Sequence, residues 1–151
     1  MYKNFNKKIE GYLFSPIELF VTVSIIILLV FIVIENLSVS RMKAYDALAL
    51  KGYDKIKLAL YSNMSLPNPV RKFMIQNMVG PAPLPEPLED VFLDEGVRLN
   101  YLIRIAEKSK RGQSKDLLRF EVTHKKGDRI YRYTEVRGIL TEQVISKSSL
   151  E

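Results

Sequence analysis

A long apolar run near the start of the chain constrains the fold more than any other feature. Residues 14–34 comprise 21 amino acids with a single charge, Glu18. A helix of about 21 residues is about 32 Å long, which is enough to cross the hydrocarbon core of a bilayer. We therefore expect a transmembrane helix over 14–35, preceded over 1–13 by a basic leader with Lys3, Lys7 and Lys8.

Two targeting interpretations fit a basic leader followed by an apolar run, a cleaved signal peptide and an uncleaved signal anchor. The length of the run and the presence of Glu18 favour the anchor. No A-x-A cleavage sequence follows, and Ser38-Val39-Ser40 is the nearest approximation. Basic residues are nearly balanced across the span and leave its orientation open, with Arg41, Lys43 and Lys51 on the far side.

The apolar run passes into an amphipathic stretch over 36–65 without a helix breaker. Apolar residues recur there at steps of three and four, which is typical of one face of a helix: Met42, Tyr45, Ala49, Tyr53, Ile56, Leu60 and Met64. Gly52 weakens this stretch, and Pro67 is the first hard stop. The pattern predicts one helix from about residue 15 to residue 64, about 75 Å long, half in lipid and half packed on a soluble domain.

A proline-rich acidic connecting loop is expected over 66–95, where six of the seven prolines lie. Alternating prolines favour an extended, polyproline-like path. A short helix is expected over 70–78, within VRKFMIQNM. A loop lying on the surface and a PxxP-type docking segment both fit the remainder.

Residues 96–151 predict an antiparallel sheet domain. Apolar and polar residues alternate over 97–105 and over 118–123, and a Gly127-Asp128 turn leads into RIYRYTEV. A fourth strand is expected over 139–145. We expect the inward side chains to include Val97, Leu99, Tyr101, Ile103 and Ile105. The amphipathic helix can cover one face of this sheet, so the predicted class is α+β.

Catalytic chemistry finds little support in the composition. The chain has no cysteine and one histidine, His124, which lies beside the predicted Lys125-Lys126-Gly127-Asp128 turn. No nucleophile elbow and no cluster of metal-ligand residues accompanies it. We therefore expect neither an enzyme nor a cofactor or metal site.

Glu18 has a local explanation at the edge of the span. Ser15-Pro16-Ile17-Glu18 has the pattern of a capping box, with Ser at the N-cap, Pro at the first helical position and Glu at the third. The Ser15 hydroxyl would accept a hydrogen bond from the backbone N–H of Glu18. The Glu18 carboxylate would accept one from the backbone N–H of Ser15 and would interact favourably with the helix N-terminus.

The stretch LFSPIELFVTVSIIILLV resembles the N-terminal signature of type IV pilins and of the pseudopilins of type II secretion. In those families a prepilin peptidase cuts after a leader glycine. The new first residue is usually Phe, often methylated, and Glu is fifth. Phe14 and Glu18 match these positions, although Leu13 precedes Phe14 and Gly11 lies two residues earlier. Cleavage after Leu13, cleavage after Gly11 and an uncut chain remain open.

The resemblance implies a structural subunit, a minor pilin or a pseudopilin, with pilus or pseudopilus subunits as partners. Glu18 would pair with the N-terminal ammonium of a neighbouring subunit. The chain would cross the inner membrane once, with its sheet domain periplasmic or extracellular, and would be incorporated in a fibre. The family's architecture also matches the predicted long helix and antiparallel sheet.

A binding role is the alternative. Residues 98–137 contain twelve Lys or Arg and five Asp or Glu. A loop cluster, Lys108, Lys110, Arg111 and Lys115, together with nearby tyrosines, has the composition of a surface that holds DNA or an envelope partner. Solvated strand faces, partly opposite the acidic 86–95 segment, explain the same charges, and nucleic acid is the less favoured partner.

Overall fold

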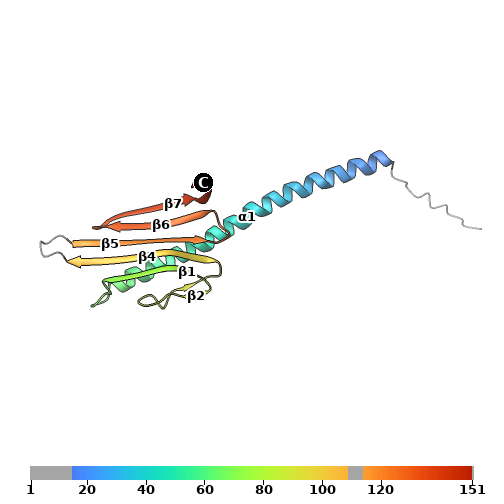
Figure 1. Ribbon diagram of the computed structural model, residues 1–151. Coiled ribbons are helices and arrows are strands. Elements are labelled where there is room, and N and C mark those ends of the chain that lie inside the picture. Colours follow the sequence, from blue (N-terminus) through green and yellow to red (C-terminus); the bar gives the residue numbers. More distant parts are fainter. Residues whose placement is uncertain (1–14, 109–113, 151) are drawn as a thin grey trace, which may run out of the picture. The chain divides into compact units, whose positions relative to one another are not determined.

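The computed structural model describes residues 15–108 and 114–150 (Figure 1). One long helix comes first and seven strands follow it, which confirms the predicted α+β class. The elements are α1 (Pro16–Met64), β1 (Lys72–Val79), β2 (Ala82–Pro83), β3 (Phe92–Leu93), β4 (Val97–Lys108), β5 (Ser114–His124), β6 (Arg129–Val136), β7 (Ile139–Ser146) and a short 3-10 helix (Lys147–Ser149). The chain divides into two compact units, Met1–Ser38 and Val39–Glu151.

The helical part of the first unit is mainly apolar and is exposed along its whole described length. It is long and apolar enough to cross a membrane. Two of its hydroxyl side chains bond to carbonyl groups one turn earlier, Thr22 Oγ1 to Glu18 O at 2.7 Å and Ser24 Oγ to Phe20 O at 2.8 Å. These bonds satisfy polar groups that would otherwise be costly in hydrocarbon.

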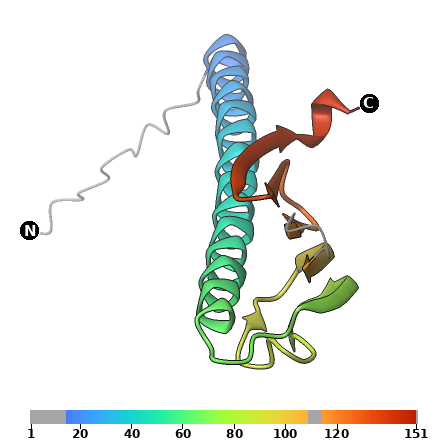
Figure 2. The ribbon, with the colours of Figure 1, turned by 90° about the vertical axis from the view of Figure 1, so that its left-hand side faces the viewer.

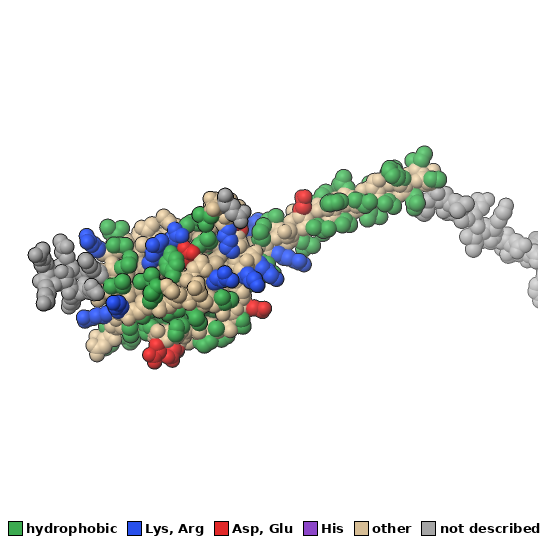
Figure 3. All heavy atoms as spheres, in the orientation of Figure 1, with side chains coloured by type: hydrophobic (Ala, Val, Ile, Leu, Met, Phe, Trp, Pro, Cys, Tyr) green, Lys and Arg blue, Asp and Glu red, His purple; other side chains and the backbone are tan. Residues whose placement is uncertain are grey.

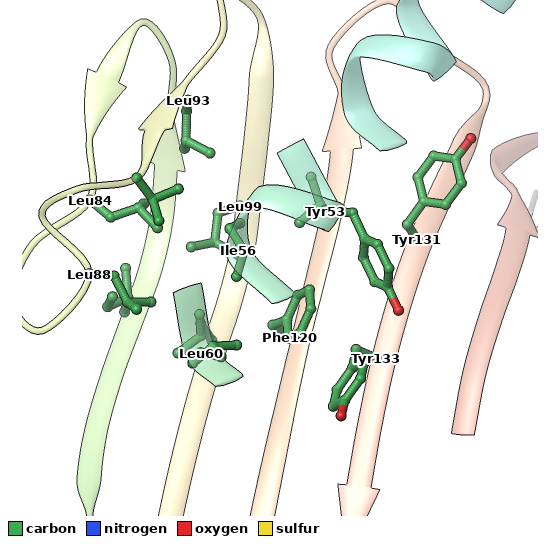
Figure 4. Close-up of a cluster of buried hydrophobic side chains, with 14 of the residues drawn as sticks. Tyr53, Ile56, Leu60, Leu84, Leu88, Leu93, Leu99, Phe120, Tyr131 and Tyr133 are labelled. Carbon is green, nitrogen blue, oxygen red and sulfur yellow. The ribbon is translucent and has the colours of Figure 1, made fainter. Parts of the chain in front are cut away.

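In the second unit the last part of α1 packs against one face of an antiparallel five-stranded sheet with the order β1-β4-β5-β6-β7 (Figure 2). The helix contributes Ala49, Tyr53, Ile56 and Leu60 to the core, as the apolar periodicity predicts (Figure 4). Met42 is 41% exposed, so the prediction was wrong for that residue. Gly52 permits close packing, because a Cβ there would lie 3.0 Å from Cγ1 of Val97.

A β-bulge in β4 changes which side chains face the helix. The pairing between β4 and β5 shifts by one residue between Leu99 and Tyr101. Because successive side chains of a strand alternate between faces, the shift reverses the pattern beyond Asn100. Leu102 and Arg104 are buried, whereas the alternation had predicted Tyr101, Ile103 and Ile105, which are only partly buried.

Arg104 gains a specific position from this shift. Its guanidinium donates a hydrogen bond of 3.1 Å to Oδ1 of Asn63, near the end of α1, and both residues are buried. No basic residue lies in the last turn of α1 itself. Arg104 therefore brings a positive charge from the sheet to the negative end of the helix dipole. Burial lowers the pKa of Arg104, while the charges of Asp116 and Glu135 act in the opposite direction.

The predicted connecting loop over 66–95 is the largest correction. The helix expected over 70–78 was wrong, because residues 72–79 form β1, which pairs with β4 at every position except Asn77. Alternation in KFMIQNMV, with Ile75 buried, fits a half-buried strand once β4 supplies a partner. The proline segment also folds back through the β2–β3 pair and does not follow a polyproline path. It places four side chains in the core: Leu84, Leu88, Val91 and Leu93.

The strand expected over 139–145 is present as β7, at the edge of the sheet. A two-residue turn joins it to β6, since Val136 pairs directly with Ile139. Both turn residues have positive φ, 53° at Arg137 and 80° at Gly138. Two positive φ angles define the type I′ turn, whose twist matches that of a β-hairpin.

Candidate functional site

Glu18 lies in the first turn of α1 and is exposed. Its Oε2 accepts a hydrogen bond of 3.0 Å from the backbone N–H of Ser15, the bond expected from a capping box. Ser15 O in turn accepts the first helical bond, from Leu19 N at 3.0 Å. Within residues 15–108 and 114–150, Ser15 Oγ accepts no bond from the backbone N–H of Glu18, so only one half of the box is formed.

Pro16 is the first residue of α1, where its missing N–H costs no helical bond. The three residues predicted to govern processing, Gly11, Leu13 and Phe14, lie outside the described residues. Among residues 15–108 and 114–150, no donor bonds to the other carboxylate oxygen of Glu18, Oε1.

Two of the four residues of the predicted basic loop cluster, Lys110 and Arg111, also lie outside the described residues. The backbones of Lys108 and Lys115 belong to β4 and β5, where Lys108 pairs with Ser114 and Lys115 with Glu107. The structure therefore places the two lysines on neighbouring strands, close to the connection between them. It does not describe a surface formed by all four residues.

The ion pairs that the described residues form with the acidic connecting segment come from the helix and not from the basic strands. Asp94 lies 3.2 Å from Nζ of Lys55 and 3.4 Å from Nζ of Lys51, both on α1. Lys55 also donates to the carbonyl oxygen of Phe92 at 3.2 Å. Burial alone would raise the pKa of Asp94, but the hydrogen bond and charge of Lys55, with help from Lys51, lower it below its usual range.

A polar cluster occupies the sheet face opposite α1. Glu121 is only 7% exposed and accepts hydrogen bonds from Arg132 Nε at 2.9 Å, from Asn100 Nδ2 at 2.7 Å and from Tyr101 at 3.4 Å. The bond with Glu121 raises the pKa of Arg132. Every oxygen of this carboxylate is paired, so the cluster joins three strands and offers no free group for chemistry.

One end of the second unit, which we call the Tyr45 end, gathers residues that are distant in the sequence. His124 stacks on Tyr45 with ring centroids 4.5 Å apart, and its Nδ1 accepts from the backbone N–H of Lys126 at 3.1 Å. Asp46 accepts from the backbone N–H of Arg129 at 2.9 Å. Nζ of Lys126 lies 5.7 Å from the centre of the Tyr45 ring. These contacts hold the turn over 125–128 against α1.

His124 is thereby explained as a structural residue. It is 4% exposed, and its Nε2 lies 3.2 Å from the carbonyl oxygen of Glu95. With Nδ1 accepting a backbone N–H, Nε2 is the atom that carries a proton and donates it to that carbonyl group. Gly96 keeps this contact open, since a Cβ there would lie 2.5 Å from Nε2. No described group of three or more His, Asp or Glu side chains could hold a metal ion.

The sequence analysis placed His124 beside a lysine turn but did not predict its contacts with Tyr45 and Glu95. An open groove of about 830 Å³ lies there, lined by residues that include Tyr45, Val79, Glu95 and Lys125. A second open groove, of about 580 Å³, lies between α1 and the loop over 87–92 and is lined mainly by apolar side chains such as Leu58 and Phe92. The adjacent lysines Lys125 and Lys126 could be recognised in the sequence as a basic turn. That they lie near Tyr45 depends on the sheet register, which the sequence pattern does not give.

Comparison of the chain with protein-family models, with curated proteins and with solved structures found no match.

Proposed function

We propose that this protein is a pilin-like structural subunit, a minor pilin or pseudopilin, which assembles through its apolar N-terminal helix. One observation carries the proposal. A carboxylate, Glu18, lies in the first turn of an exposed apolar helix long enough to cross a membrane, and no described basic side chain pairs with it. The resemblance of residues 14–18 to the mature N-terminus of type IV pilins adds support.

The proposed assembly depends on how a charge behaves in lipid. An ionised carboxylate costs on the order of 2.5–3.5 kcal/mol at the centre of a membrane helix, and less near the interface. The N–H of Ser15 satisfies one oxygen of Glu18 in the single chain. A cationic group from a neighbouring subunit would satisfy the other. A pair of this kind compensates the buried charges and selects one register between adjacent helices.

In this proposal the chain crosses the inner membrane once and carries its second unit on the non-cytoplasmic side. Its partners are other subunits of the same fibre. The exposed apolar side chains of α1 before Ser38 contact lipid in the single subunit and neighbouring helices in the assembly. A prepilin peptidase would release the N-terminal ammonium that pairs with Glu18.

The test compares three variants expressed in the native host. Glu18→Ala removes both the cap and the charge, and Glu18→Gln keeps a carbonyl oxygen that can accept from Ser15 but removes the charge. Glu35→Ala is the matched control, because Glu35 is another exposed carboxylate of α1. Both Glu18 variants should resist alkaline extraction from membranes yet fall about tenfold or more in sheared fibres or crosslinked assemblies.

Two results would contradict this proposal. Normal assembly of Glu18→Gln would leave helix capping as the role of Glu18, and normal assembly of Glu18→Ala would remove the residue from assembly altogether. The mass and N-terminal sequence of the native protein add an independent check. A chain beginning at Phe14 supports the pairing, and one beginning at Tyr12 displaces Glu18 by two positions. One beginning at Met1 has no ammonium at Phe14, where the pairing requires it.

A further inference from the structure

The Tyr45 end carries basic side chains that have no ion-pair partner among the described residues. Arg41, Lys43, Arg98, Lys125 and Lys126 are all exposed. None of them forms an ion pair with a described residue, since the ion pairs of the structure use Lys51, Lys55, Lys57 and Arg132. Figure 3 shows several Lys and Arg side chains gathered on the second unit, near the end where α1 enters it.

Three carboxylates at this end already have partners among the described residues. Asp46 accepts the backbone N–H of Arg129, and Asp94 pairs with Lys51 and Lys55. Asp128 accepts from Ser146 and from the backbone of Ser148. Lys147 is partly buried and donates to two carbonyl groups, those of His124 and Gly127. Glu95 is a fourth carboxylate at this end and is exposed. Because five exposed basic side chains accompany it, the surface of the Tyr45 end is positive.

Two of these basic residues follow the apolar run closely in the sequence. Arg41 and Lys43 come seven and nine residues after Ile34. The headgroup layer occupies the first several ångströms beyond the hydrocarbon core. Lys and Arg have side chains long enough to reach back toward that layer. The contacts of Tyr45 and Asp46 hold Lys125 and Lys126 at the same level of the helix.

Exposed apolar side chains accompany the basic ones. Val39 and Met42 of α1 are 46% and 41% exposed, and Val79 at the end of β1 is 45% exposed. Val79 pairs with Arg98, so an apolar and a basic residue lie side by side at the edge of the sheet. Basic side chains mixed with apolar ones are typical of surfaces that lie on a bilayer interface.

We propose that the Tyr45 end is a docking surface for anionic lipid headgroups, and that Arg41, Lys43, Arg98, Lys125 and Lys126 hold the second unit against the membrane before assembly. The inference rests on the membrane insertion proposed above. Attraction between basic residues and an anionic surface is strong within about one Debye length, about 8–10 Å, and weakens with added salt. Docking would present the sheet unit of each subunit to its neighbours from a fixed height above the bilayer.

The experiment uses the full chain in vesicles of phosphatidylcholine, with or without phosphatidylglycerol, and a quencher attached to the headgroups. Because the chain has no cysteine, a single introduced cysteine carries the fluorophore. Val79→Cys reports the Tyr45 end. Ile139→Cys, 72% exposed at the opposite end of the sheet, is the control position. Alkaline extraction and flotation first establish that each variant is inserted.

Phosphatidylglycerol should increase quenching at residue 79 and not at residue 139, and high salt should reverse the increase. In Lys125→Glu/Lys126→Glu the increase should fall at least about fivefold. Arg71→Glu/Lys72→Glu makes the same change of charge at the far end of β1 and should leave it intact. Equal quenching in both lipids, or an unchanged increase in the Lys125/Lys126 variant, would overturn the inference.

Two other outcomes are distinguishable. If the chain fails to insert in either lipid, the membrane proposal fails together with the docking surface, whereas insertion without a lipid effect removes only the docking surface. A DNA duplex added to phosphatidylcholine vesicles tests a different partner. Duplex binding that is lost in Lys125→Glu/Lys126→Glu, without any effect of phosphatidylglycerol, would assign the surface to nucleic acid and overturn the lipid assignment.

Discussion

Two core tyrosines differ in how their hydroxyl groups are satisfied. Tyr133 Oη lies 2.9 Å from Tyr61 Oη and donates to Glu135 at 2.9 Å. Tyr53 Oη is buried and has no hydrogen-bond partner among the described residues. Burial and then the nearby charge of Glu142 raise the pKa of Tyr53 well above the usual tyrosine range. The two rings share one aromatic cluster with Phe120, so they differ mainly in their polar atoms.

Removing each hydroxyl group should therefore have different effects. Tyr53→Phe removes an unpaired buried group, and we expect the free energy of unfolding to stay constant or to rise. Tyr133→Phe removes a hydroxyl group that is hydrogen-bonded to Tyr61 and Glu135 and leaves those two groups without that partner. The free energy of unfolding should therefore fall by about 1 kcal/mol or more. Urea unfolding of the full chain in one detergent measures both. A loss of equal size for the two variants would show that Tyr53 has a partner.

At the scale of single elements, substitutions in the turn between β6 and β7 can test backbone strain without a change in packing. Gly138 has a φ of 80°, and a Cβ placed there would meet no atom within 4 Å. Arg137 has a φ of 53°, a conformation that costs most residues roughly 1–2 kcal/mol but that Asn adopts more readily.

Arg137→Asn should raise the free energy of unfolding by several tenths of a kcal/mol, up to about 1, because Asn-Gly is the preferred type I′ pair. Gly138→Ala should lower it by about 1 kcal/mol through strain alone. Thermal unfolding of both variants in the same detergent provides the comparison. If Gly138→Ala proves neutral, the hairpin adopts another turn in solution.

Over the whole second unit, ion pairs between α1 and distant segments link stability to pH. Lys51 and Lys55 hold Asp94 of the connecting segment, and Lys57 pairs with Glu142 of the edge strand. The hydrogen bond from Lys57 lowers the pKa of Glu142 despite partial burial. For Asp94 the lysines outweigh burial, and its pKa is also lowered.

A lowered carboxyl pKa stabilises the fold above the unfolded value, which is about 4 for these groups, and this contribution disappears as pH falls through the lower folded value. The free energy of unfolding should therefore decrease below about pH 4. Asp94→Asn should cost roughly 1 kcal/mol or less at neutral pH and should make that acid decrease shallower. The control is Glu89→Gln, an exposed carboxylate of the same loop outside any described ion pair. Equal acid profiles for Asp94→Asn and the unaltered chain would contradict the assignment.

The sequence by itself determined the features that depend on near neighbours along the chain. The extent of α1, its apolar and amphipathic parts, the strands β5 to β7 and the start of the helix at Ser15-Pro16 all follow from periodicity and breakers. Such signals act within a turn or a few residues, because helical bonds join residues four apart and side chains alternate along a strand. The carboxylate of Glu18 belongs to the same class, since its cap lies three residues away.

Only the tertiary structure decided what depends on pairing between distant residues. β1 lies in a segment with weak local preference and becomes a strand because β4 offers it an edge. The bulge at Asn100 places Arg104 on the inward face of β4. There its guanidinium donates a hydrogen bond to Asn63 and lies near the negative end of the helix dipole. The Tyr45 end unites residues near 43, 98 and 125 because the sheet register brings them together. No local sequence pattern predicts these contacts. They join segments that are far apart in the sequence, and the free energy that they contribute overrides the local preferences of those segments.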